Sequence, residues 1–294
     1  MKDAMRLSLA SRLSFSSRLF FDSLAAIIAL TASAEAITRG QVTRDPNGSR
    51  GSVVRVESSR GELCSGAVIA PDLVLTAAHC VLDRAQYRVV AVDRRFRPVS
   101  IRAVAAAMHP QFVGGTTPRS QPGVDLAILK LERPLGADFV PLDPRRAGRV
   151  GEGQPVDLAG FGIVGEGMKG TARVLREARL VSLGTLQVSN RVVVVADGER
   201  RAAIAGAGAC RGDSGGPILG GGPGGYQLLG IVSWSSGPMV SRDGSACGGL
   251  TAVTPVAEHT SWIASRSDDL RRLSPGQAIA SPRAGGNPFD WATR

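Results

Sequence analysis

The sequence predicts an all-β protein, and two observations support that prediction. Between Gly51 and Val253, short runs rich in Val, Ile and Leu alternate with Gly, Pro, Asp and Ser. This is the pattern of short antiparallel strands separated by turns. Helical periodicity is nearly absent from the same stretch. Strands this short and this numerous are typical of barrels and sandwiches.

Nine segments match the strand pattern, each a short apolar run bounded by turn residues. They are Ser52–Glu57, Ala67–Ala70, Leu73–Thr76, Tyr87–Val92, Leu126–Leu131, Pro155–Ala159, Leu175–Leu183, Arg191–Val195 and Leu228–Val232. We therefore expect a β-rich core that occupies most of the chain.

The C-terminal part changes character. Between Val253 and Arg266, the residues Val256, Trp262 and Ile263 are spaced for one apolar helical face, which predicts a helix docked on the last strands. Residues 267–294 are rich in Pro, Gly, Ala and charge without periodicity. They predict a flexible tail after a globular domain of residues 37–266.

The N-terminal part has the features of a secretory signal peptide. Arg6, Arg12 and Arg18 precede the apolar run 24–30, and small residues follow at 34–36. The run is shorter than the roughly 20 residues of a membrane-spanning helix. Residues 1–36 are therefore expected to be a signal peptide, and the remainder a secreted or periplasmic protein with no stable membrane insertion after cleavage.

Composition and charge are those of an ordinary folded protein. The chain is 43% hydrophobic and 20% charged, and its net charge of +10 comes from 35 Lys and Arg against 25 Asp and Glu. The basic residues are scattered, and no basic patch is interleaved with aromatic residues. We interpret the charge as solvated surface and expect no nucleic-acid partner.

Four cysteines suit an exported protein with two disulfides. They are Cys64, Cys80, Cys210 and Cys247, and their spacing leaves all three possible pairings open. None of them forms a pair with the short spacing of structural zinc ligands, so no metal site is expected.

The strongest chemical signal is the run GDSGGP at residues 212–217. Ser214 stands among glycines that let the backbone approach a bound group closely. The amide N–H groups of Gly212 and Ser214 could stabilise an oxyanion formed when this serine attacks a carbonyl. A surface turn is the alternative, since Gly, Asp and Ser are common in turns.

A serine nucleophile needs a base, and the chain has three histidines. His79, in LTAAHC, follows an apolar strand and precedes a cysteine, which is a rigid place for an imidazole. His109, before a proline, and His259, on the predicted helix, are interpreted as surface histidines.

Asp125 opens the apolar segment GVDLAIL at residues 123–129. A carboxylate there is expected to be partly buried, and burial without a partner is costly. Its partner is either a backbone amide that it caps or the imidazole of His79.

Together, TAAHC, DLAIL and GDSGGP resemble the trypsin/chymotrypsin family in wording and order, over roughly residues 37–266. The resemblance implies two antiparallel six-stranded β-barrels with a C-terminal helix. It also implies a serine endopeptidase that acts on proteins or peptides through the triad His79, Asp125 and Ser214, without a cofactor. We expect a bacterial secreted member.

The same resemblance assigns further roles. It pairs Cys64 with Cys80 and Cys210 with Cys247. It makes Ser233 a hydrogen-bond partner of the triad aspartate, and the backbone of residues 233–235, which includes Trp234, a strand partner for substrate. Residues 93–97 occupy the region where relatives hold calcium, but their positive charge argues against a calcium site.

The predicted specificity pocket departs from trypsin. Gly208 stands six residues before Ser214, where trypsin-like relatives have an aspartate, and Ala209 follows it. Without a buried carboxylate, cleavage after Lys or Arg is not expected, and a neutral or hydrophobic side chain is. Ser235 and Gly249 are expected to line the pocket. Arg211 at the rim would favour acidic neighbours.

Activation in the family inserts a new N-terminal amine beside the aspartate that precedes the catalytic serine. Here these residues are Ile37 and Asp213. Because Ile37 follows the small residues of the predicted cleavage site, we expect signal peptidase to expose it directly, without a zymogen stage.

Two other classes of protein share parts of this pattern. A protease-like binding protein would keep the fold without turnover, and loss of a triad residue or of Asp213 would be its signature, but all four are present. A stress-type protease with appended peptide-binding domains is disfavoured because only a short tail is expected after the catalytic region.

Overall fold

The computed structural model describes residues 37–273 except 44, 46–47, 83–84, 115–122, 188–189, 223–224 and 242–243. The predicted signal peptide lies outside the described residues, as does the predicted tail from residue 274 onwards. Within the described ranges, no helix has the length and apolar character needed to cross a bilayer.

The first barrel closes in the order β2-β3-β4-β7-β6-β5, with β5 returning to β2, and every pairing is antiparallel. Its strands are β2 (Val53–Ser58), β3 (Leu63–Ala70), β4 (Leu73–Thr76), β5 (Tyr87–Val92), β6 (Pro98–Met108) and β7 (Ala127–Leu131). Large side chains such as Leu75, Tyr87 and Ile128 are fully buried in its core. Closure removes the free sheet edges that short strands would otherwise expose.

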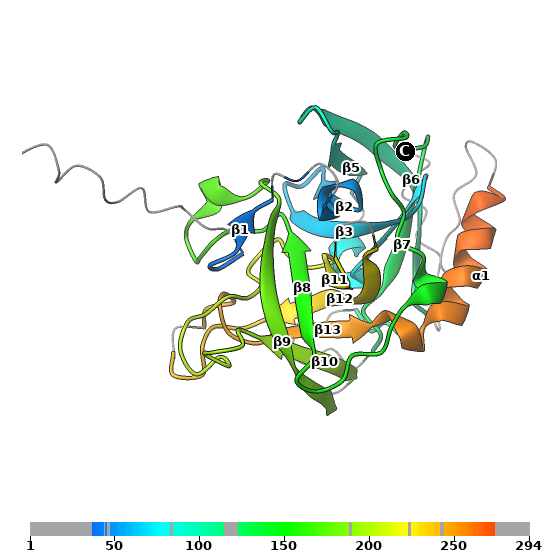
Figure 1. Cartoon of the computed structure of the whole chain (residues 1–294). Coiled ribbons are helices and arrows are strands. Elements are labelled where there is room, and N and C mark those ends of the chain that lie inside the picture. The colour runs from blue at the N-terminus through cyan, green and yellow to red at the C-terminus, as the bar shows by residue number, and fades with distance from the viewer. Residues whose placement is uncertain are drawn as a thin grey trace, which may run out of the picture. The chain divides into compact units, whose positions relative to one another are not determined.

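The second barrel contains β8 (Pro155–Gly160), β9 (Arg176–Gln187), β10 (Arg191–Ala196), β11 (Pro217–Gly220), β12 (Gln227–Ser235) and β13 (Thr251–Pro255). Pairing of β8 with β9 closes the order β9-β10-β13-β12-β11-β8, and β1 (Gln41–Val42) adds to β9. Figure 1 shows this group of strands beside the first barrel, with α1 next to β6 and β7. The predicted pair of six-stranded barrels is confirmed.

All nine predicted strands are present, β4 and β5 with the predicted ends and the other seven with shifted ends, and four strands were missed: β1, β6, β11 and β13. The longest of them, β6, is rich in alanine and has β-branched side chains only at Val99, Ile101 and Val104, so its sequence shows a weak strand preference. Its partners β5 and β7 nevertheless bond it along its length. Tertiary pairing therefore overrides weak local preference.

The predicted start of the C-terminal helix at Val253 is wrong. Val253 pairs with both β10 and β12 as part of β13, and α1 runs over Thr260–Arg271. A short 3₁₀ turn, Val256–Glu258, separates the two elements. The helix also continues past residue 266, where we placed the end of the domain. Its residue Leu270 is fully buried, so this last turn packs against the rest of the protein.

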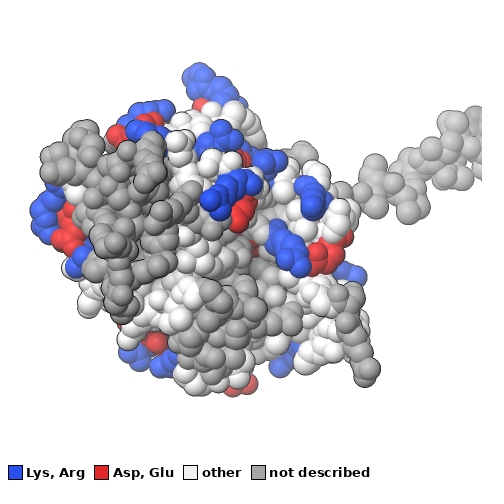
Figure 2. Space-filling model, turned by 180° about the vertical axis from the view of Figure 1, so that it is seen from behind, with Lys and Arg blue, Asp and Glu red and all other residues white. Residues whose placement is uncertain are grey.

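On the face in Figure 2, the basic side chains of the described residues stand at several separate places. Acidic side chains lie beside several of them (Figure 2). Ion pairs such as Arg97–Asp93, Arg179–Asp157 and Arg102–Glu132 account for part of this arrangement. Exposed pairs of this kind contribute little to stability.

Candidate active site

His79 and Asp125 form a close pair in the first barrel. His79 lies on the 3₁₀ turn Ala78–Val81, which follows β4, and Asp125 lies two residues before β7. His79 Nδ1 is 2.8 Å from Asp125 Oδ2, and the His79 amide donates to Oδ1 at 3.0 Å. The Asp125 side chain is fully buried, whereas 21% of the His79 side chain is exposed. The imidazole is thus anchored at one nitrogen and accessible on its other side.

A third side chain, from the second barrel, completes this contact. The Ser233 hydroxyl on β12 donates to Asp125 Oδ2 at 2.6 Å. Burial favours the neutral carboxyl, but the charge and hydrogen bonds of His79, together with that of Ser233, outweigh burial and lower the pKa of Asp125. Burial likewise opposes a charged imidazole, yet Asp125 raises the pKa of His79 above its ordinary value. Asp125 is therefore ionised at neutral pH.

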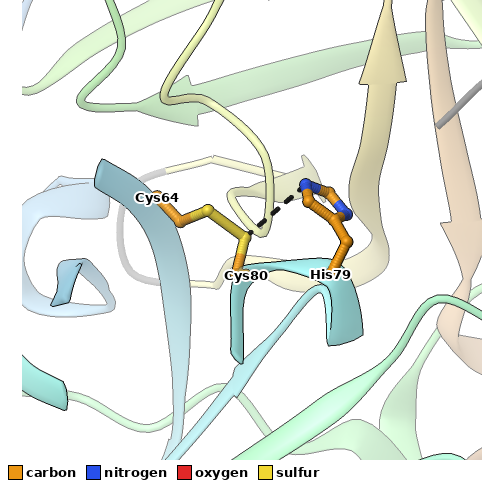
Figure 3. Close-up of side chains that lie close together, drawn as sticks. All are labelled: Cys64, His79 and Cys80. Carbon is orange, nitrogen blue, oxygen red and sulfur yellow. Dashed lines mark hydrogen bonds between the residues drawn. A yellow bond between two sulfur atoms is a disulfide. The ribbon is translucent and has the colours of Figure 1, made fainter. Parts of the chain in front are cut away.

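The carboxylate also sets the tautomer of His79. An ionised Asp125 only accepts hydrogen bonds, so the neutral imidazole carries its proton on Nδ1 and leaves a lone pair on Nε2. Nε2 lies 3.7 Å from Cys80 Sγ, beside the disulfide that joins Cys80 to Cys64 (Figure 3). This nitrogen is the one available to take a proton from a nucleophile.

The cluster of Cys64, His79 and Cys80 has the closeness of a metal site but not its chemistry. Both sulfurs are bonded to each other, so neither offers the thiolate that zinc requires. The second disulfide joins Cys210 to Cys247. Both bridges follow the pairing that the family resemblance implied.

Ser214 is brought to the same place by the loop before β11. Its carbonyl accepts from the Ser65 amide at 2.8 Å and lies 3.8 Å from Cys80 Sγ, the sulfur beside His79. Gly215 next to it has φ +81°, and a Cβ there would lie 2.3 Å from the Ser65 carbonyl, so only glycine fits. Among the described residues, the Ser214 hydroxyl makes no hydrogen bond, and catalytic hydrogen bonds are often long or unformed in an enzyme without substrate.

Two backbone amides around Ser214 face away from the protein's own acceptors. The Arg211 carbonyl accepts from Ile163 N and the Asp213 carbonyl accepts from Gly216 N, each at 2.9 Å. In a trans peptide the N–H points opposite to the C=O. The N–H groups of Gly212 and Ser214 therefore point the other way, and neither finds an acceptor in the described part of the chain.

Asp213 is a buried carboxyl held by backbone amides. Gly162 N donates to one of its oxygens at 2.8 Å and Cys210 N to the other at 2.9 Å. Burial nevertheless raises its pKa to about 7, against the effect of these two bonds and of the Arg176 charge. Ile37, the predicted mature N-terminus, is also fully buried.

The predicted pocket residues lie together at the base of this loop. A Cβ added to Gly208 would lie 3.2 Å from the Gly249 carbonyl, so these two residues are neighbours. Ala209 is fully buried, and the Ser235 hydroxyl donates to the Ala246 carbonyl at 2.6 Å. Trp234, a residue of β12, packs against buried side chains of its own barrel. Glycine backbone thus takes the place of a charged side chain at Gly208.

Sequence reasoning missed Glu166, which joins three loops at this rim. Its carboxylate is 3.0 Å from Arg211 Nε and accepts from the Ala246 amide at 2.8 Å. The charge of Arg211, which we expected to act on acidic substrate residues, is therefore paired within the protein. A single glutamate in a glycine-rich loop gives no sequence signal for such a contact.

Two closed six-stranded barrels that share a carboxylate-bound histidine and a serine in a glycine loop define the chymotrypsin-type class of proteins. The sequence model of the family described as Trypsin matches residues 39–263. The chain belongs to the trypsin family and is a serine-type endopeptidase.

Individual relatives agree with this assignment. Granzyme M of Homo sapiens is 31% identical over 240 residues, which cover 73% of this chain and 83% of the relative. Chymotrypsin-like elastase family member 1 of Homo sapiens is 28% identical over 232 residues, or 71% and 83%. Because these relatives are animal proteins, our expectation of a bacterial member is not borne out.

Solved structures support the fold alone at their level of identity. Human heparin binding protein aligns with a TM-score of 0.59 at 24% identity, covering 82% of this chain and all of that one. Neuropsin from mouse brain aligns with a TM-score of 0.59 at 20% identity, covering 78% and 99%.

Proposed function

We propose that His79, Asp125 and Ser214 form the catalytic triad and that peptide bonds are hydrolysed through an acyl-enzyme on Ser214. The observation that supports this assignment most strongly is the 2.8 Å contact between His79 Nδ1 and Asp125 Oδ2. That contact leaves Nε2 as the proton acceptor on the side where the Ser214 loop lies.

The reaction follows from these positions. Ser214 Oγ attacks the scissile carbonyl carbon while its proton passes to His79 Nε2, and the carbonyl electron pair moves onto oxygen. Collapse of this intermediate breaks the C–N bond, and the leaving amine takes the proton from Nε2. Water then attacks the ester in the same way, releasing the acid and returning the proton to Ser214.

The oxyanion is stabilised by the amides of Gly212 and Ser214. Both N–H groups point away from carbonyls that are held inside the protein, and neither has an acceptor within the described ranges. Donors fixed in this way before reaction need no reorganisation as charge develops, which is the origin of their effect on rate.

The primary specificity is for neutral or hydrophobic side chains. Gly208 supplies no carboxylate to pair with a Lys or Arg side chain, and burial of such a cation without a partner is costly. Ala209, Ser235 and Gly249 form the remaining walls. The substrate backbone adds as a strand alongside residues 233–235.

The mature enzyme begins at Ile37 after removal of a signal peptide, and it acts outside the cytoplasm in a secreted or periplasmic form. Two disulfides suit an oxidising compartment. Its new amine pairs with Asp213, whose pKa burial raises to about 7 although the charge of Arg176 opposes the shift. Sequencing of the mature N-terminus tests this assignment, and a start away from Ile37 contradicts it.

The triad assignment is tested by the mass of the mature protein after treatment with a fluorophosphonate, with Ser214→Ala as the control. A single adduct on the wild type that is absent from the variant supports an assembled site, since an isolated serine hydroxyl is a poor nucleophile. A folded and correctly processed wild type that gains no mass would favour a binding protein without turnover.

A further inference from the structure

Ser65, on β3 directly after Cys64, is hydrogen-bonded to two carbonyls of the Ser214 loop, those of Gly212 and Ser214. Its side chain is fully buried. The hydroxyl donates to the Gly212 carbonyl at 2.9 Å and accepts from the Phe161 amide at 3.0 Å. The Ser65 amide donates to the Ser214 carbonyl at 2.8 Å. One residue of the first barrel therefore holds the loop at both Gly212 and Ser214.

Three consecutive peptide groups link residues 211 to 214, and each has its carbonyl held by one donor. Backbone amides hold the first and third, through Ile163 and Gly216. The middle carbonyl, that of Gly212, is held by the Ser65 hydroxyl. Three donors thus fix the planes of these peptides, and Ser65 is the one that does so with its side chain.

The middle peptide is also the one with the greatest freedom to rotate. Gly212 has φ +95°, a conformation that glycine reaches without strain and can leave as easily. Rotation of this plane would tilt both neighbouring peptides, which carry the proposed oxyanion donors. The Ser65 hydroxyl is well suited to prevent this rotation, because it is buried and is itself fixed by the hydrogen bond that it accepts from the Phe161 amide.

Ser65 is also connected to the histidine side of the site. Thr76, at the end of β4, donates its hydroxyl to the Ser65 carbonyl at 2.8 Å and is fully buried. Thr76 lies three residues before His79 in the chain. Ser65 therefore connects β4, the strand that precedes His79, to the loop that carries Ser214.

We propose that Ser65 is a positioning residue for catalysis, which holds the Gly212 carbonyl so that the Gly212 and Ser214 amides stay aimed at the developing oxyanion. This inference rests on the proposed function of Ser214. We expect its effect mainly on the transition state, because the two hydrogen bonds of the Ser65 hydroxyl go to Gly212 and Phe161 and not to the proposed pocket residues or the substrate strand.

The test compares Ser65→Ala with the wild type and with Ser52→Ala. Ser52 is a matched control, since it is also a buried serine of the first barrel whose hydroxyl donates to a carbonyl, that of Val140, at 2.6 Å. The measurements are kcat and KM on a peptide amide, the Kd of a peptide boronic acid, which mimics the tetrahedral intermediate, and Tm. Active sites are counted with the fluorophosphonate so that kcat refers to folded protein.

Loss of one oxyanion donor costs roughly 10²- to 10³-fold in kcat, so loosening two donors without removing them is expected to cost about 10- to 100-fold. Ser65→Ala should lower kcat and weaken boronic acid binding by similar factors, with KM within about twofold. Ser52→Ala should change neither factor. Equal kcat in Ser65→Ala and the wild type would overturn the proposal, as would losses that Ser52→Ala reproduces.

If Ser65→Ala does not fold, Ser65→Gly decides the question, because its smaller residue leaves room for a water to satisfy the two buried partners. A kcat loss without a KM change in that variant supports the proposal, and wild-type kcat overturns it. Failure of the wild type to react with the fluorophosphonate would instead reject the proposed function, which keeps the two failures distinguishable.

Discussion

The Ser233 hydroxyl, from the second barrel, donates a 2.6 Å hydrogen bond to the Asp125 carboxylate of the first barrel. This bond joins the two halves of the protein at the carboxylate that orients His79. Removal of the hydroxyl in Ser233→Ala leaves Asp125 buried with one bond fewer, and a hydrogen bond to a charged group contributes about 1.5 to 3 kcal/mol. We expect kcat/KM to fall by about 10-fold, measured on a peptide amide. An unchanged value would show that His79 alone orients the carboxylate.

The pH profile of kcat/KM should report the pKa of His79. Only the neutral imidazole accepts the serine proton, so activity should fall on the acid side with an apparent pKa above the ordinary 6.5, as Asp125 raises it. In Asp125→Asn the imidazole of His79 stays buried but loses the negative charge beside it, so its pKa should fall and the acid side of the kcat/KM profile should move to lower pH. The maximum value of the profile should drop by about 10⁴-fold, as in the trypsin-family template. An apparent pKa that is the same in Asp125→Asn and the wild type would contradict the effect of Asp125 on His79.

A carboxylate at the pocket base should change the specificity. Gly208→Asp introduces the negative charge that a Lys or Arg side chain requires, and we expect the ratio of kcat/KM for Arg over Leu peptides to rise by at least about 10-fold. A Cβ at this position approaches the Gly249 carbonyl at 3.2 Å, so a lower Tm is also expected. Wild type that already prefers Arg would contradict the proposed neutral pocket.

Release of Arg211 should alter preferences beside the scissile bond. Glu166→Gln removes the negative partner 3.0 Å from Arg211 Nε, which frees a cation at the rim. Acidic residues next to the cleavage site should gain about 2- to 5-fold in kcat/KM, and the gain should shrink at high salt. Glu132→Gln, which breaks the remote pair with Arg102, is the control and should leave the peptide-library profile as it is.

The stability of the chain that still carries residues before Ile37 should fall as pH rises from 4 to 7. Asp213 has a pKa of about 7 in the folded state and near 3.8 when unfolded, so the folded state binds more protons between these values and loses stability as pH rises. The full difference is roughly 4 kcal/mol. The slope of Tm against pH should flatten in Asp213→Asn, and also after exposure of the Ile37 amine. Parallel slopes in all three forms would contradict this role for Asp213.

Local patterns in the sequence were enough to predict most strands and to single out His79, Asp125 and Ser214 as the candidate site residues. The motifs TAAHC, DLAIL and GDSGGP are each a local pattern around one candidate residue, so each can be recognised without knowledge of the tertiary structure. The prediction failed at β6 and β13, where strand pairing, rather than residue preference, decides the conformation. It also extended the helix backwards through Val253 because apolar spacing alone cannot distinguish a short strand from a helical turn.

The sequence by itself determined the all-β class and the positions of His79, Asp125 and Ser214, because short strands and glycine loops leave local signals. The contacts that join these residues to the rest of the site depend on tertiary structure. Ser65 meets Gly212, and Glu166 meets Arg211, across long stretches of sequence. A serine or glutamate in a sequence does not indicate which distant carbonyl or cation it will reach. Closure of two barrels against each other decides that, since it sets which loops face one another.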